Sequence, residues 1–167
     1  SDSPGDDKFK AYPELAKLYG GGYLLRAKAF DVVRADASEG YDYARFFDST
    51  GDDTLVAQRD SSRISGPGFE VTANGYDKLL AYAETGNDVA HFMDSPANDV
   101  VRARSHKTMM WSGSYTDPDY LLTARRFDEV HASAAGFVDD FDVAKLHDTA
   151  GDDQVEAEYL TGDVSRA

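Results

Sequence analysis

One short pattern, Asp-x-apolar-x-Ala, recurs along the chain at a nearly constant spacing and limits the possible folds more than any other feature. Its seven copies begin at Asp7, Asp31, Asp53, Asp77, Asp99, Asp128 and Asp153. Subtracting consecutive numbers gives steps of 24, 22, 24, 22, 29 and 25 residues. Such a period is typical of repeat proteins, in which a unit cannot bury its apolar face alone and stacks on its neighbours. We therefore expect function on the surface of a stack.

Every second unit carries an additional strand-like segment. These segments are 42–48, 88–94 and 142–148, and in the first of them Asp42, Ala44 and Phe46 alternate with outward residues at period two. Period two indicates a β-strand, and turn-forming residues such as Ser49-Thr50-Gly51-Asp52 follow. The full repeat is thus a pair of rungs, 46 residues long from Asp53 to Asp99.

These features predict an all-β fold. We expect a parallel β-helix or β-solenoid of about seven rungs of ~23 residues, with an antiparallel β-sandwich as the alternative. The constant order of the pattern, Asp first and Ala last, favours parallel stacking. At 167 residues the chain suits a single repeat domain, 1–167, which we expect to be part of a longer multidomain protein.

The net charge of −14 comes from 31 acidic and 17 basic residues. Nucleic acids and anionic membranes attract basic surfaces, so the composition argues against both as partners. No apolar run approaches the ~20 residues of a transmembrane helix, and we expect a monomer without membrane insertion.

The regularly placed Asp residues need a structural explanation, because stacked carboxylates repel one another. In one reading each carboxylate accepts backbone N–H groups of an adjoining turn. In the other, Ca²⁺ lies between carboxylates and turn carbonyls. The predicted metal ligands flank the turns between strands and are Asp48, Asp52, Asp53, Asp94, Asn98, Asp99, Asp148, Asp152 and Asp153.

The two-rung unit resembles tandem repeats of large secreted or cell-surface proteins of planctomycetes and other aquatic bacteria. The clearest copies are 30–57 and 76–103, and 127–157 is a third with an insertion. The resemblance implies an extracellular or bacterial cell-surface location, beside modules that handle polysaccharides. It implies no catalytic residues.

An insertion at 102–120 lengthens one unit and holds the only Trp of the chain. Aromatic rings stack on sugar rings, and basic side chains bind sulfate or carboxylate groups. The sequence therefore predicts a carbohydrate-binding site here, although Trp111 could instead fill a gap beneath its own insertion. The candidate residues are Arg102, Arg104, His106, Lys107, Trp111, Tyr115 and Tyr120.

Two further features carry weaker predictions. Asp139 and Asp140, in a second departure at 136–141, could bind a cation or act as an acid and base. Basic residues at outward strand positions could form a ladder for an anionic polysaccharide, or could neutralise neighbouring acids. This series consists of Arg34, Arg45, Arg102 and Lys145, with Arg125 or Arg126.

Three functions from different classes remain. The favoured one is a non-catalytic extracellular carbohydrate-binding module for a plant, algal or matrix polysaccharide, neutral or anionic. The alternative is a calcium-stiffened structural or adhesive spacer of a cell-surface protein. A polysaccharide lyase or hydrolase ranks third, because a β-helix alone does not imply catalysis, and we expect no enzyme activity.

Overall fold

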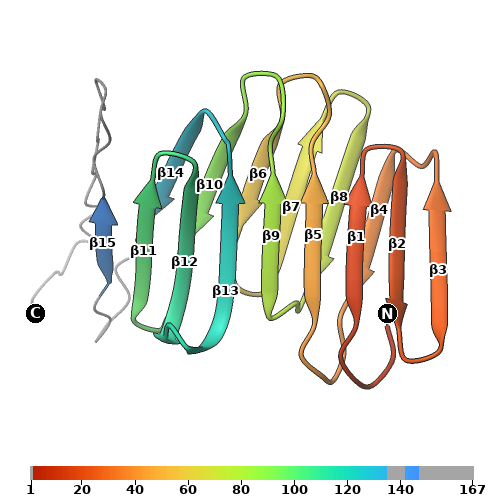
Figure 1. Ribbon diagram of the computed structural model, residues 1–167, viewed down its shortest axis with the longest axis horizontal. Coiled ribbons are helices and arrows are strands. Elements are labelled where there is room, and N and C mark those ends of the chain that lie inside the picture. The colour runs from red at the N-terminus through yellow and green to blue at the C-terminus, as the bar shows by residue number, and fades with distance from the viewer. Residues whose placement is uncertain (1, 135–141, 147–167) are drawn as a thin grey trace, which may run out of the picture.

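The computed structural model describes residues 2–134 and 142–146, and this part of the chain contains strands and no helix. The strands form two sheets that stack face to face, with the long axis of the molecule running across the strands (Figure 1). The nine-stranded sheet has the order β15-β11-β12-β13-β9-β5-β1-β2-β3, and the six-stranded sheet has the order β14-β10-β6-β7-β8-β4.

The fifteen strands divide into three units of five. In each unit three strands form an antiparallel meander in one sheet, the fourth strand crosses to the other sheet, and the fifth returns. The first unit holds β1 (Lys8–Tyr12), β2 (Leu15–Gly20), β3 (Tyr23–Lys28), β4 (Val32–Asp36) and β5 (Tyr43–Phe47). The second holds β6 (Thr54–Ala57), β7 (Ser61–Gly66), β8 (Phe69–Asn74), β9 (Lys78–Tyr82) and β10 (Val89–Met93). The third holds β11 (Asp99–Arg104), β12 (Lys107–Ser114), β13 (Asp117–Arg125), β14 (Glu129–Ser133) and β15 (Val143–Leu146).

Consecutive units exchange the roles of the two sheets. The first and third meanders, β1-β2-β3 and β11-β12-β13, lie in the nine-stranded sheet, whereas β6-β7-β8 lies in the six-stranded sheet. Strands from neighbouring units pair in parallel, as β5 does with β9 and β10 with β14. Every unit therefore contributes to both sheets and is joined to the next unit in each of them.

The core lies between the sheets, where the Asp-x-apolar-x-Ala pattern places a large residue and then a small one. Phe9 and Ala11 of β1 point inward, as do Ala44 and Phe46 of the parallel neighbour β5. The rings of Phe9 and Phe46 meet edge to face with centroids 6.2 Å apart, a favourable geometry for two aromatic rings. The repeated Ala keeps the space narrow, so a single layer of large side chains fills it.

The prediction of an all-β solenoid is confirmed, and the structure describes about three turns. The count of seven rungs is not confirmed. Two strands of each meander, such as β2 and β3, remain in the sheet of the first strand and do not advance the coil. In the described part, antiparallel strand pairs occur only within meanders. The same residues contain no candidate membrane-spanning helix.

We predict that Phe46→Ala lowers the free energy of unfolding by about 3–5 kcal/mol, because the side chain is fully buried and its removal leaves a cavity. Urea denaturation followed by circular dichroism measures the change. Met93→Ala is the matched control, since Met93 is 44% exposed. An equal loss in both variants would contradict the assignment of the core.

Candidate metal centre

Three groups of Asp residues recur at equivalent positions of the units. In each group one carboxylate oxygen from every member lies within 4.8 Å of the others. We call them triad 1 (Asp2, Asp7, Asp42), triad 2 (Asp48, Asp53, Asp88) and triad 3 (Asp94, Asp99, Asp142). The first and second members advance by the 46-residue repeat, since 48 − 2 and 94 − 48 are both 46, as are 53 − 7 and 99 − 53. One geometry therefore occurs three times.

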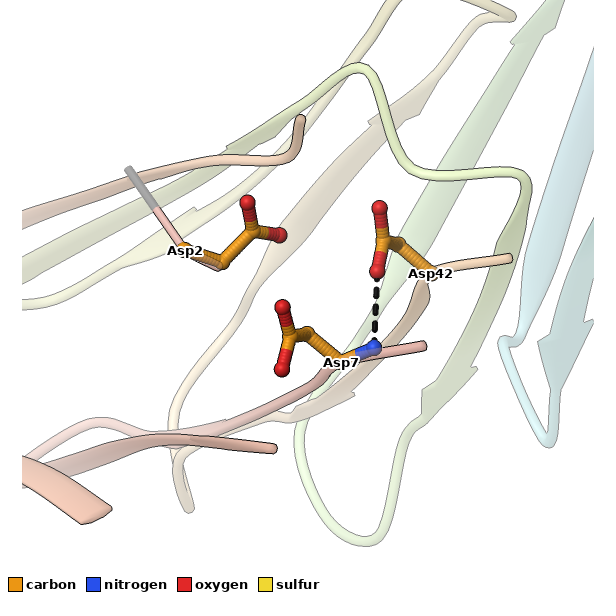
Figure 2. A group of neighbouring side chains, drawn as sticks. All are labelled: Asp2, Asp7 and Asp42. Carbon is orange, nitrogen blue, oxygen red and sulfur yellow. Dashed lines mark hydrogen bonds between the residues drawn. The ribbon is translucent and has the colours of Figure 1, made fainter. Parts of the chain in front are cut away.

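Each triad is positioned by the starts of two neighbouring parallel strands. In triad 1, Asp7 precedes β1 and Asp42 precedes β5, and the backbone N–H of Asp7 donates to the Asp42 carboxylate at 2.8 Å (Figure 2). The equivalent bonds in triads 2 and 3 join Asp53 to Asp88 and Asp99 to Asp142, both at 2.9 Å. The strand pairing thus fixes the separation of two carboxylates.

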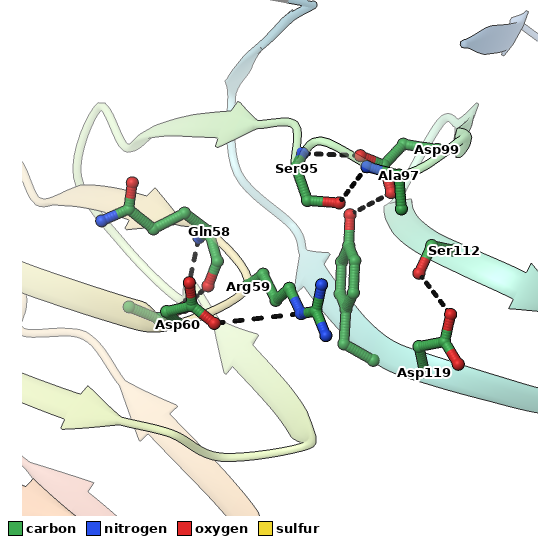
Figure 3. Close-up of polar contacts among 10 residues, drawn as sticks. Gln58, Arg59, Asp60, Ser95, Ala97, Asp99, Ser112 and Asp119 are labelled. Atoms are coloured by element: carbon green, nitrogen blue, oxygen red, sulfur yellow. Dashed lines mark hydrogen bonds and ion pairs between the residues drawn. The ribbon is translucent and has the colours of Figure 1, made fainter. Parts of the chain in front are cut away.

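The turn before each strand caps the middle Asp. The backbone N–H groups of Ser3, Ser49 and Ser95 donate to Asp7, Asp53 and Asp99 at 3.0, 2.8 and 2.6 Å, and Figure 3 shows the third of these turns. The turn-capping role expected from the sequence is therefore present in every unit. Capping leaves other carboxylate oxygens of the triads without a donor.

Triad 2 lies where the chain passes from one sheet to the other. Asp48 follows β5 of the nine-stranded sheet, whereas Asp53 and Asp88 precede β6 and β10 of the six-stranded sheet. The Asp48 carboxylate also accepts the backbone N–H of Glu84, just after β9, at 2.6 Å. A ligand bound by all three carboxylates would join the two sheets and two consecutive units.

Buried polar atoms without a hydrogen-bond partner gather mainly at triad 1, with one at triad 2. Six of the seven such side-chain atoms in the described residues are Asp2 Oδ1, Asp2 Oδ2, Asp42 Oδ2, Tyr23 OH, Tyr76 OH and Asp53 Oδ1. Tyr76 lies close enough to Asp2 and Asp42 for their charges, together with its burial, to raise its pKa. Buried polar groups in proteins nearly always have a partner in the protein or in ordered water, so these atoms are available to a water molecule or a ligand.

The electrostatics of the triads also favour a bound cation. Burial raises the pKa of Asp42 and the pKa of Asp48 to about 6, with neighbouring carboxylates adding to both shifts. Burial likewise raises the pKa of Asp88. None of the ion pairs in the described part involves a triad residue. Two carboxylates at such separations repel by about 3 kcal/mol at an effective dielectric constant of 20.

Glycine makes room for the middle carboxylate in two units. A Cβ atom on Gly20 or Gly66 would overlap the Oδ1 atom of Asp7 or Asp53, respectively. The paired residues across the hairpin are Tyr23 in the first unit and Phe69 in the second. The close backbone approach holds each carboxylate in place without occupying its second oxygen.

The third unit differs at this position. Tyr120 lies opposite Ser112, as Phe69 lies opposite Gly66, and its hydroxyl donates to Asp99 Oδ1 at 2.5 Å. Phe69 has no hydroxyl, and Asp53 Oδ1 accordingly has no partner. Triad 2, whose three members are all buried, therefore keeps free the carboxylate oxygen that Tyr120 occupies in triad 3.

The donor set fits Ca²⁺. Calcium takes 6–8 oxygen ligands at 2.3–2.6 Å, so two oxygens bound to one ion lie at most about 5 Å apart. The triads supply only oxygen and no His or Cys, which suits a hard cation. A protein site for Mg²⁺ demands shorter and more regular octahedral coordination. Carboxylates at strand starts and turns, completed by water or turn carbonyls, match calcium better.

The predicted ligands divide into three groups. Asp48, Asp53, Asp94 and Asp99 lie in triads 2 and 3. Asp52 and Asn98 are exposed at the same turns, and Asp52 instead accepts the backbone N–H of Asn87 at 2.8 Å. Three predicted ligands, Asp148, Asp152 and Asp153, lie outside the described residues, as do Asp139 and Asp140.

Sequence reasoning missed the third member of each triad. Asp42, Asp88 and Asp142 were assigned only to strand starts, and Asp2 received no metal role. We expected Asp7, Asp31 and Asp53 to stack, but the hydrogen-bonded columns instead run Asp7-Asp42-Asp77 and Asp53-Asp88-Asp128. The cause is the exchange of sheets between units, which separates consecutive copies of the pattern. A spacing of 35 residues, from 7 to 42 and from 53 to 88, is the signal that could have revealed the pairs.

The aromatic residues predicted to bind sugar are largely enclosed. Trp111 is 3% exposed, and Tyr120 is buried between the sheets on Asp99. Trp111 packs edge to face on Tyr115, whose exposed fraction is 52%, and the Arg102 guanidinium lies over both rings. Of the three rings, only that of Tyr115 has a large exposed surface.

The basic members of the same prediction lie at one hairpin. Arg104 ends β11 and Lys107 begins β12, with the exposed His106 in the turn between them. Arg102 pairs with Met109 on the same pair of strands. These cations remain candidates for binding an anionic ligand, whereas the rings of Trp111 and Tyr120 are enclosed.

Comparison of the chain with protein-family models, with curated proteins and with solved structures finds no match. We therefore base the proposed function on the geometry of the chain itself.

We predict that, without divalent cations, the folded protein loses stability as the pH rises from about 4 to above 6. Asp42 and Asp48 titrate near 6 when folded, against about 3.9 when unfolded, so the folded state binds more protons in this range. The stability that Asp42 and Asp48 contribute is fully present below their pKa in the unfolded state and is lost above their pKa in the folded state. Urea denaturation in chelator at about pH 4.5 and about pH 7.5 measures the difference. This difference in unfolding free energy between the two pH values should be smaller in the Asp48→Asn variant. A difference equal to that of the original protein would refute the role of Asp48.

Proposed function

We propose that the protein is a calcium-binding structural repeat, a β-solenoid spacer whose units are joined by ions held in the Asp triads. The observation that carries the proposal is the recurrence of one three-carboxylate geometry in all three units, with partnerless buried oxygen atoms at triads 1 and 2. We propose an extracellular or cell-surface setting, where calcium-binding modules operate with modest affinities. The proposal requires no catalytic step.

Calcium would stiffen the solenoid at the crossovers between sheets. With Asp48 at the end of one unit and Asp53 and Asp88 in the next, an ion at triad 2 would resist separation of the units. It would also remove the repulsion among the three carboxylates. A ligand that binds only the folded state adds about 2.7 kcal/mol of stability at a free concentration 100 times its Kd.

Polysaccharide binding through the 102–120 insertion remains a second prediction. It depends on Tyr115 as the exposed ring and on the neighbouring basic side chains, because Trp111 and Tyr120 are enclosed. The triads are the stronger basis for a function, since their geometry recurs in all three units.

We predict that calcium binds the protein and raises its thermal unfolding temperature, and that Asp53→Asn weakens both effects. The substitution keeps the shape of the side chain but removes one of the charges at triad 2. Isothermal titration calorimetry on chelator-treated protein gives the stoichiometry and affinity. Asp52→Asn is the matched control, because it removes the same charge from the adjacent exposed position. Absence of calcium binding, or equal loss in the two variants, would reject the proposal.

We also predict a reciprocal pair of effects from Phe69→Tyr and Tyr120→Phe. A hydroxyl at position 69 would donate to Asp53 as Tyr120 donates to Asp99, and would lower calcium affinity at triad 2. Removal of the Tyr120 hydroxyl would free Asp99 Oδ1 and raise affinity at triad 3. Calorimetry on both variants measures the two shifts, and shifts of the same sign would contradict the assignment.

A further inference from the structure

The outer face of the nine-stranded sheet collects most of the basic residues of an acidic chain. Outward positions alternate with buried ones along strands such as β1 and β5, and the strand registers place the outward positions of the sheet on one surface. Twelve of the 17 Lys and Arg residues of the chain lie there. We call this surface the cationic face: Lys8, Lys10, Lys17, Arg26, Lys28, Arg45, Lys78, Arg102, Arg104, Lys107, Arg125 and Lys145.

Acidic residues are nearly absent from the strands of this sheet. In their described part they are limited to Asp99, which is buried in triad 3, and to Asp117 and Asp119 in the β12–β13 hairpin. The chain as a whole carries a net charge of −14. Positive charge is therefore segregated onto one face.

Four cations form a continuous row across neighbouring strands. The register pairs Arg26 of β3 with Lys17 of β2, Lys17 with Lys10 of β1, and Lys10 with Arg45 of β5. Adjacent strands lie about 4.8 Å apart, so the row spans roughly 14 Å. It runs across the strands and therefore along the long axis of the molecule (Figure 1).

A second basic group lies farther along the same face. Arg125 of β13 pairs with Lys107 of β12, which pairs with Arg104 of β11. Burial lowers the pKa of Lys107, and the charges of Arg125 and Arg104 lower it further. Like charges thus crowd together here, and no ion pair within the described ranges joins them to a carboxylate.

Stacked aromatic rings connect the two groups. Tyr12, Phe47 and Tyr82 lie on β1, β5 and β9, with ring centroids 4.5 Å and 5.3 Å apart in successive pairs. Lys10 lies 5.0 Å from the centroids of Tyr12 and Phe47, and the Arg125 guanidinium lies 5.9 Å from that of Tyr82. Cation–π contacts hold these side chains in place but leave their charge uncompensated.

Neutralisation by neighbouring acids does not explain the cationic face. The ion pairs among the described residues join Arg59 to Asp60, Arg63 to Glu70, and His131 to Glu129, all outside this sheet. The outer face of the six-stranded sheet is different in composition, with Arg34 and Arg63 accompanied by acidic residues such as Glu70. The expected basic ladder is therefore divided, because Arg34 lies on that other sheet and Arg126 lies just after β13.

We propose that the cationic face binds a linear anionic polysaccharide, which lies along the long axis with its sulfate or carboxylate groups on the two basic groups. This inference does not depend on calcium. A thin linear chain suits a row of cations that follows the axis of the solenoid. Single-stranded nucleic acid fits less well, because base stacking needs free ring faces and Tyr12, Phe47 and Tyr82 stack on one another.

Affinity electrophoresis and calorimetry test the proposal, with chelator present so that the triads do not contribute. Chondroitin sulfate, which carries sulfate and carboxylate groups, is the probe, and neutral dextran is the control ligand. We expect binding to chondroitin sulfate alone, weakened by added salt. The double variant Lys10→Gln with Arg45→Gln should lose about tenfold in affinity, since it removes two charge-assisted contacts.

The matched control is Arg34→Gln with Arg63→Gln, which removes the same charge from the outer face of the six-stranded sheet. A second pair, Lys17→Gln with Arg26→Gln, repeats the test in the same row, and circular dichroism confirms that all variants fold. No binding, equal binding of dextran, or equal losses in the control pair would overturn the proposal. Tighter binding of single-stranded DNA or of phosphatidylserine vesicles would also overturn it, in favour of those ligands.

Discussion

The hydrogen bond from the backbone N–H of one strand-leading Asp to the carboxylate of the next fixes the relation between parallel strands. It links Asp7 to Asp42 and Asp42 to Asp77, and equivalent bonds join Asp53, Asp88 and Asp128. A one-residue slip would break the bond and would also turn the inward side chains outward. The Asp at the start of each strand therefore sets the register on which the core and the triads depend. The crowding of carboxylates follows from the same arrangement.

Much of the fold could be predicted from local pattern. Alternation at period two indicates the strands, and Asp-x-apolar-x-Ala marks the first and fourth strands of each unit and their inward residues, such as Phe9 and Ala11. The choice of sheet is not a local property. Whether β6 pairs beside β5 or faces it depends on the crossover, and no residue near Ser49 or Gly51 encodes that choice in a recognisable way. The predicted columns failed for this reason, although their members were correctly placed at strand starts.

Prediction of the candidate site from the sequence is limited in the same way, because its members meet through strand pairing that is not a local property. Asp48 and Asp53 lie five residues apart on one turn, so sequence reasoning could pair them. Asp88 reaches them through the pairing of β6 and β10, 35 residues after Asp53, and only the recurrence of this spacing between Asp7 and Asp42 points to it in the sequence. The aromatic prediction meets a different limit, because amphipathic rings suit both a sugar site and a core. In Tyr120 the hydroxyl meets a buried carboxylate while the ring fills space between the sheets.

The exchange of sheets between units ties the symmetry of the molecule to the number of repeats. An odd-numbered unit adds four strands to one sheet and one to the other, and an even-numbered unit does the reverse, which gives the observed nine and six. Extension by one more unit of the same kind would equalise the two sheets. Chains with even and odd numbers of units would thus differ in shape as well as length. A parent protein could set the balance between its two faces through the parity of its repeats.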